Sequence, residues 1–293
     1  MGNQIVRIIS TAFLLLICSS FAYGNDSQPV PAVRYWKPTT GSSISVRTVD
    51  PYSQIPKPPA RSDPKLLVVM YHNLVFGRTG NVYNRDIYNF EHDVLFLKRN
   101  FEIIDFDELQ RILAKDRDVT TDVAIITFDD GDLSMYALAY PLLTEYDIKA
   151  TFFIVPSYIG EIGYMSLDQI REMNDYRNNK DVALFSFESH SFSHQYLGEI
   201  QHDQLLFELN ESKRILEKEI GETIDVLALP FGSGAGNQQL IEAVRNAGYS
   251  FLRTSVPLAP RIHTVDGMNI PAFNVENYSN DEFVRRVLQL TKR

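Results

Sequence analysis

The apolar run over residues 123–128 ends abruptly in two adjacent carboxylates, Asp129 and Asp130, followed by Gly131. Its length and β-branched content predict a buried strand, and glycine permits the sharp turn that ends it. Neighbouring side chains on an extended strand point to opposite faces, so both acids can address one site only where the chain bends. An ordinary Asp-Gly turn would give the same pattern. The rest of the chain must decide between a turn and a site.

Other apolar runs that predict strands also end in polar or turn residues. They are residues 66–70 before His72, residues 182–187 before His190 and His194, and residues 224–229 before Pro230, Phe231 and Gly232. Helical patterns alternate with the strands, which predicts βα units and an α/β fold with a parallel sheet or barrel. The carboxyl ends of parallel strands face one side, where active sites are built. Four such clusters on one rim therefore favour a site.

The remaining elements follow from hydrophobic spacing and capping residues. Further strands are predicted over residues 150–155, 251–254 and 268–273. Helices are predicted over residues 89–99, 107–115, 134–146, 201–220 and 238–247, after the capping box of Ser166 and Gln169, and after Asn280 as a cap.

Length and composition favour one large domain behind an export signal. The 293 residues are 44% hydrophobic, and the net charge of -9 without a dense basic cluster argues against nucleic-acid binding. Residues 1–24 resemble a signal peptide whose apolar run is too short for a comfortable membrane span, although an uncleaved anchor stays open. Residues 25–64 are predicted to form an arm rich in Pro, Ser and Thr, and residues 65–293 the folded domain. Cys18 is the single cysteine, so a cleaved chain has no disulfide or cysteine-based zinc site.

His190 and His194 are four residues apart, close enough for both imidazoles to bind one ion if the chain coils after the strand. A surface pair on a helix would show the same spacing. Two histidines and one carboxylate would leave coordination positions open, which is typical of a catalytic metal site. The neighbouring acid would then act as general base.

Three segments resemble the first motifs of the polysaccharide deacetylases, the NodB-homology domains of carbohydrate esterase family 4. They are Thr127-Phe128-Asp129-Asp130-Gly131, His190-Ser191-Phe192-Ser193-His194 and Leu229-Pro230-Phe231-Gly232. The resemblance covers about residues 66–273 and implies an irregular (β/α) barrel. It implies hydrolysis of the N-acetyl group of a GlcNAc unit, with release of acetate. The implied roles are Asp129 as general base, Asp130, His190 and His194 as ligands of a divalent metal, usually zinc, and Pro230 and Phe231 as substrate-binding residues, with the Phe231 backbone N–H at the oxyanion.

The chain also departs from the family pattern. Ala228 stands where the family usually has the arginine that orients the base, so the sequence leaves that orientation unexplained. The strand that usually comes last resembles residues 67–72 at the front, as in a permuted subgroup that includes deacetylases of poly-N-acetylglucosamine. This order implies His72 as the general acid. His263 is the rival acid, and a His72 that merely caps a strand is the other alternative.

The resulting expectation is an exported, metal-dependent deacetylase, acting as a monomer on peptidoglycan, poly-N-acetylglucosamine or a chitin-like polymer. The location would be periplasmic, cell-surface or secreted. One alternative is a non-catalytic carbohydrate-binding or assembly protein on the same fold, which the missing arginine suggests. The other is an esterase or amidase that acts on a different acylated substrate.

Overall fold

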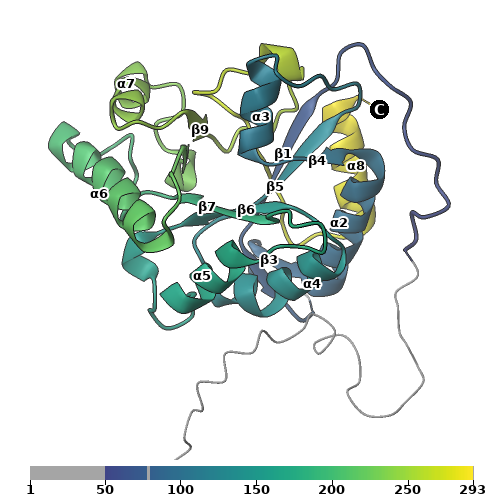
Figure 1. Cartoon of the computed structure of the whole chain (residues 1–293), viewed down its shortest axis with the longest axis horizontal. Coiled ribbons are helices and arrows are strands. Elements are labelled where there is room, and N and C mark those ends of the chain that lie inside the picture. The colour runs from purple at the N-terminus through teal and green to yellow at the C-terminus, as the bar shows by residue number, and fades with distance from the viewer. Residues whose placement is uncertain (1–49, 78–79, 293) are drawn as a thin grey trace, which may run out of the picture.

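The computed structural model describes residues 50–77 and 80–292 (Figure 1). The predicted signal peptide and most of the predicted arm lie outside the described residues. The described part of the arm, residues 50–64, is mostly exposed and irregular. Its Tyr52 ring packs edge-on against Phe96, with 5.5 Å between the ring centroids. In the part of the chain that the structure describes, no helix is both long and apolar enough to cross a membrane.

The centre of the molecule is a parallel sheet in the order β10-β1-β5-β6-β7-β8-β9, with β4 beside the start of β5. Its strands are β1 (Leu66–Tyr71), β4 (Glu102–Ile103), β5 (Val123–Phe128), β6 (Ala150–Ile154), β7 (Phe185–Ser189), β8 (Val226–Ala228), β9 (Phe251–Arg253) and β10 (Phe273–Asn274). A separate parallel pair, which the sequence did not predict, consists of β2 (Asn73–Val75) and β3 (Asn84–Asp86).

The sheet curls into a half-barrel whose two edges are joined by one segment, residues 267–275. Ile270 first exchanges backbone hydrogen bonds with β9, and the segment then pairs with β1 at Phe273 and Asn274. The predicted strand over residues 268–273 is therefore wrong in extent, because the chain crosses from one edge to the other and only its end is regular. The predicted α/β class and barrel are confirmed.

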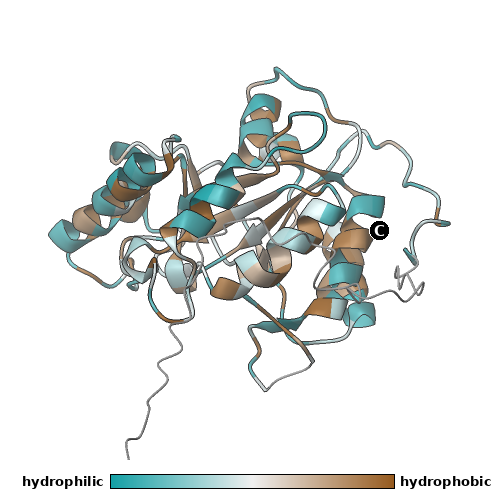
Figure 2. Cartoon of the chain, turned by 60° about the horizontal axis from the view of Figure 1, so that its bottom comes forward, coloured by the Kyte–Doolittle hydropathy of each residue, from teal (hydrophilic) through white to brown (hydrophobic). Residues whose placement is uncertain are grey.

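Alternate residues of the strands supply two separate cores. Inside the curve, Leu66, Val68 and Ile125 pack with α3, whereas Leu67 and Ile126 face the other helices. Both faces of the sheet are thus buried, which explains why the strands appear as continuous apolar runs. In Figure 1, α3 lies on the opposite side of the sheet from α4 and α5. Figure 2 shows that the strands are largely hydrophobic, while the helices around them are mixed.

The helices lie close to the predicted ranges, except that the first half of the helix predicted over residues 134–146 is a π-helical segment, Met135–Ala139, which leads directly into α4. They are α2 (Ile87–Asn100), α3 (Phe106–Leu113), α4 (Tyr140–Glu145), α5 (Leu167–Asp175), α6 (His202–Ile220), α7 (Gln238–Asn246) and α8 (Asn280–Thr291). The predicted capping box of Ser166 and Gln169 is confirmed. The prediction that Asn280 caps α8 is wrong, because Asn280 is the first residue of the helix and Ser279 is its cap. The Ser279 side chain accepts from the Glu282 backbone N–H, because its backbone is extended, as a cap requires.

Candidate active site

The end of β5 turns both carboxylates toward one pocket. The strand pairing ends where the Asp129 backbone N–H donates to the Tyr71 carbonyl, at 2.9 Å. Asp130 then adopts a positive φ of 79° and Gly131 one of 85°. A left-handed conformation is uncommon for a residue other than glycine, and such conformations concentrate at functional sites. Both acids line the same cavity, as the bend predicted.

The loop after β7 brings the two imidazoles to this turn. Nε2 of His190 lies 3.4 Å from Oδ1 of Asp130, and Nε2 of His194 lies 3.2 Å from the same oxygen. The Nδ1 atom of His190 lies 3.0 Å from the carbonyl oxygen of Ala228. That contact holds the ring with Nε2 toward the acids, in the way that ligating histidines are usually held.

The loop itself is anchored from α6. The buried carboxylate of Glu208 accepts a 2.8 Å hydrogen bond from the Ser193 backbone N–H. Ser191 and His194 have positive φ values of 61° and 59°. The loop thus coils tightly enough for residues four apart to reach one point, without forming a helix.

The donor set of Asp130, His190 and His194 fits a divalent metal. Their donor atoms all lie within 4.8 Å of one another. Burial opposes ionisation of Asp130, but hydrogen bonds with His190 and His194 outweigh it and hold the pKa of that carboxyl well below its ordinary value. An ionised carboxylate with two imidazoles is a ligand set suited to zinc, and three protein donors leave room for substrate and water.

Arg253 contacts Asp129 from β9, the strand at one edge of the sheet. Its guanidinium donates from Nη2 to Oδ2 of Asp129, and Nη1 lies 2.8 Å from the Met70 sulfur. The guanidinium carbon also lies 5.0 Å from the Phe153 ring centroid. Arg253 is fully buried, so these contacts restrict both the cation and the carboxylate.

This arginine supplies what the sequence left unexplained. Ala228 on β8 and Arg253 on β9 are register partners in adjacent strands. The family usually has its arginine at residue 228, on β8. In this chain the cation stands at residue 253 on the neighbouring strand β9, and it reaches the Asp129 carboxylate from there. The signal in the sequence was a single cation within an otherwise apolar strand, Phe251–Arg253, but only the strand order shows what it contacts.

His72 lies directly after β1 and lines the same cavity as Asp129. Burial lowers its pKa, although the charges of Asp129 and Asp130 act in the opposite direction. Its Nδ1 atom is buried without a hydrogen-bond partner among the described residues. The rival His263 is exposed, next to Ile262, whose backbone N–H donates to the Pro64 carbonyl before β1 begins. His263 thus lies at the other end of β1 from His72.

The side chains of the candidate active site surround a cavity of about 330 Å³. Its lining residues are Met70, His72, Asn73, Asn81, Tyr83, Asp129, Asp130, His190, His194, Leu229, Phe231, Ser255 and Asn274. The predicted residues are all among them except Pro230, which is buried. Tyr83, Ser255 and Asn274 were not predicted, because no motif marks them.

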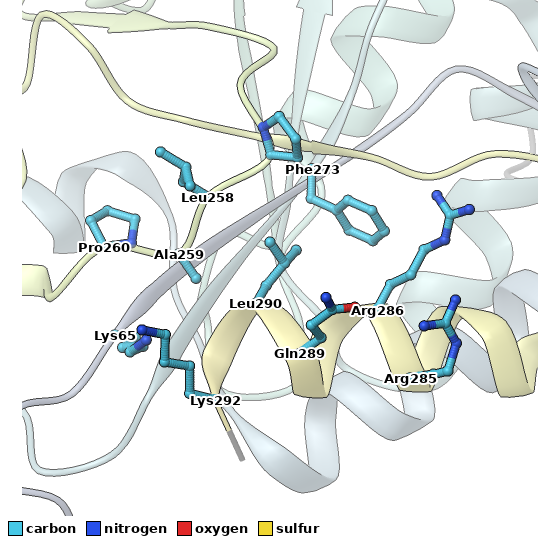
Figure 3. A pocket seen from close by; sticks show the side chains of 11 residues that line it. Lys65, Leu258, Ala259, Pro260, Phe273, Arg285, Arg286, Gln289, Leu290 and Lys292 are labelled. Carbon is cyan, nitrogen blue, oxygen red and sulfur yellow. The ribbon is translucent and has the colours of Figure 1, made fainter.

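A second cavity of about 660 Å³ lies between α8 and residues 257–260 (Figure 3). Lys65, Arg285, Arg286 and Lys292 surround an apolar floor that includes Leu290. Among the described residues that line it there is no histidine or carboxylate. Its larger volume therefore does not make it the candidate active site.

Comparisons with known proteins show similarity to polysaccharide deacetylases. The family model for polysaccharide deacetylases matches residues 116–252. YxkH of Bacillus subtilis, assigned to the polysaccharide deacetylases, is 26% identical over 257 residues, which cover 86% of this chain and 87% of YxkH. A poly-β-1,6-N-acetyl-D-glucosamine N-deacetylase of Staphylococcus aureus is 26% identical over 171 residues, covering 56% of this chain and 53% of that enzyme. The chain thus matches only about half the length of the staphylococcal enzyme.

Solved structures share the fold. The Streptococcus pyogenes deacetylase PplD, in complex with acetate, aligns with a TM-score of 0.68 and 20% identity, over 79% of this chain and 100% of PplD. IcaB of Ammonifex degensii aligns with a TM-score of 0.66 and 21% identity, over 80% of this chain and 99% of IcaB. The family model over residues 116–252, the sequence relatives and the shared fold agree with one another, and all of them show a similarity of this chain to polysaccharide deacetylases.

Proposed function

We propose that the chain is an exported, metal-dependent deacetylase that removes N-acetyl groups from GlcNAc units of a polysaccharide. One observation carries the proposal. The predicted ligands Asp130, His190 and His194 converge beside Asp129 and His72 in one cavity. The staphylococcal relative that acts on poly-β-1,6-N-acetyl-D-glucosamine supports this class of substrate. The signal-like residues 1–24 support export.

The chain's own residues supply the proton transfers. A divalent cation at Asp130, His190 and His194, with zinc the expected ion, would supply Lewis acidity toward the acetyl carbonyl. Asp129, with Oδ1 buried and unpaired among the described residues, would take a proton from the attacking water. His72 would give a proton to the amide nitrogen as the C–N bond breaks, so that acetate and a free amine leave. All these residues come from one chain, so a monomer has a complete site.

Acetate release from GlcNAc oligomers tests the proposal. We expect the purified protein to release acetate, to stop releasing it in chelator and to recover when zinc is added, because the ligand set requires a metal. Oligomers linked β-1,6 and β-1,4 and peptidoglycan fragments serve as parallel substrates. If a folded protein with bound zinc releases no acetate from any of them, the proposal is wrong. The Arg253–Asp129 contact removes the reason for expecting a non-catalytic protein, since the missing arginine is supplied from β9.

His72→Ala tests the general acid. We expect turnover to fall by about 10² to 10⁴, the usual contribution of a positioned acid or base, while bound zinc is unchanged. His263→Ala is the matched control, because His263 is exposed at the other end of β1. Turnover is measured as acetate release, and zinc by metal analysis of the purified variants. An active His72→Ala variant together with an inactive His263→Ala variant would reverse the assignment.

A further inference from the structure

Two exposed aromatic rings stack beside the candidate active site. The rings of Tyr196 and Phe231 are nearly parallel, at 12°, with their centroids 4.1 Å apart. Tyr196 is 47% exposed and Phe231 56% exposed. The Phe231 ring also lies 4.5 Å from the His194 ring and lines the cavity. The pair therefore forms an aromatic wall that begins at the proposed metal ligands and continues outward to Tyr196.

The backbone around the two rings holds them together. Tyr196 belongs to the loop after β7, and Phe231 to the loop after β8. The loops meet at two glycines, where a Cβ on Gly198 would lie only 2.6 Å from the backbone nitrogen of Gly234. The Gly198 backbone N–H also donates to the Ser233 hydroxyl, at 3.1 Å. Because the loops are docked backbone to backbone, the stack is part of the fold rather than a chance contact of two mobile side chains.

The conformation of Phe231 also indicates a site. Its φ of 58° is uncommon for a large side chain, and such conformations persist where the surrounding structure imposes them, often at functional sites. Exposed apolar surface next to a polar cavity is typical of a ligand-binding edge. The electron-rich face of an aromatic ring attracts the positive C–H edges of a ligand. One face of a pyranose presents such C–H groups.

We propose that Tyr196 and Phe231 form a binding subsite for the sugar next to the GlcNAc unit that is deacetylated. The pyranose stacks on this aromatic wall, and the wall selects chains over single sugars. The inference rests on the proposed function for the position of the reacting unit. The subsite is specific for an apolar sugar face and needs no charge, so it serves a neutral acetylated polymer.

Tyr196→Ala tests the subsite by substrate length. We expect KM for a GlcNAc pentamer to rise about threefold to tenfold, the range that one stacking contact provides, and KM for single N-acetylglucosamine, which has no neighbouring sugar, to stay unchanged. The fall in kcat should be smaller than the rise in KM, because the contact lies away from the reacting bond. Tyr196→Phe keeps the ring and should stay within about twofold of wild type by the same reasoning. Tyr88→Ala is the matched control, since Tyr88 is 57% exposed but lies on α2 and not on the two loops that carry the stack.

A second variant tests the wall without touching either ring. Gly198→Ala should separate the two loops and produce the same length-dependent rise in KM. Gly80→Ala is its control, because a Cβ there meets no atom within 4 Å. Equal ratios of pentamer KM to single N-acetylglucosamine KM in wild type and Tyr196→Ala, with matching thermal unfolding, would overturn the proposal.

Direct binding separates this proposal from the deacetylase proposal. Calorimetry with the β-1,6 and β-1,4 pentamers on the Asp129→Asn protein measures Kd without turnover. We expect Tyr196→Ala to weaken Kd by the same factor as KM. If wild type releases no acetate but pentamer binding still depends on Tyr196, the proposed subsite is supported and the proposed deacetylase reaction is wrong. If no pentamer binds, or if Kd is the same with and without the Tyr196 ring, the proposed subsite is wrong.

Discussion

His190→Ala is expected to lose the metal and reduce acetate release to background. His190 is 2% exposed, and its Nε2 faces the Asp130 carboxylate, while its Nδ1 contacts the Ala228 carbonyl. Alanine leaves only Asp130 and His194 as ligands. Loss of a group that merely orients a ligand costs roughly 10- to 100-fold in metal affinity, so loss of the ligand itself should cost more.

Zinc titration and acetate release on the same protein measure this effect. His202→Ala is the control, because His202 is exposed at the start of α6. Circular dichroism establishes that the variant is folded, since removal of a buried ring also creates a cavity. A folded His190→Ala protein that binds zinc as tightly as wild type would exclude His190 as a ligand.

Arg253→Ala is expected to lower kcat/KM by about 10²-fold, because a catalytic group misplaced by about 1 Å typically costs that much. It should also destabilise the protein by about 3–5 kcal/mol, since Asp129 would become a buried charge without its partner. Acetate release and chemical unfolding measure the two effects.

The strand register offers a rescue. Residues 228 and 253 are partners on β8 and β9, so adding Ala228→Arg to Arg253→Ala moves the cation to the usual family position. We expect the double variant to recover part of the lost kcat/KM. Arg253→Lys should recover less, because an ammonium lacks the planar fork of a guanidinium. Wild-type kcat/KM in a folded Arg253→Ala protein would contradict the role of Arg253.

Much of the fold could be predicted because its signals are local. The strands β1 and β5 lie in the predicted ranges within one residue at each end, because both of their faces are buried and nearly every residue is apolar. The predicted strand over residues 182–187 is displaced, since β7 runs over Phe185–Ser189 and carries polar residues toward the site. The short pair β2 and β3 was missed, because three residues give too little periodicity to detect.

The sequence by itself determined the class of protein, because the residues that carry the chemistry stand in short motifs at strand ends. Asp129, Asp130, His190 and His194 were predicted from such spacing, and the structure places them together. Only the tertiary structure decided how Asp129 is held. Arg253 lies 124 residues from it along the chain, and no local pattern links residues on strands that become close only when the sheet curls. The same holds for Tyr196 and Phe231, whose loops meet because two glycines allow their backbones to touch.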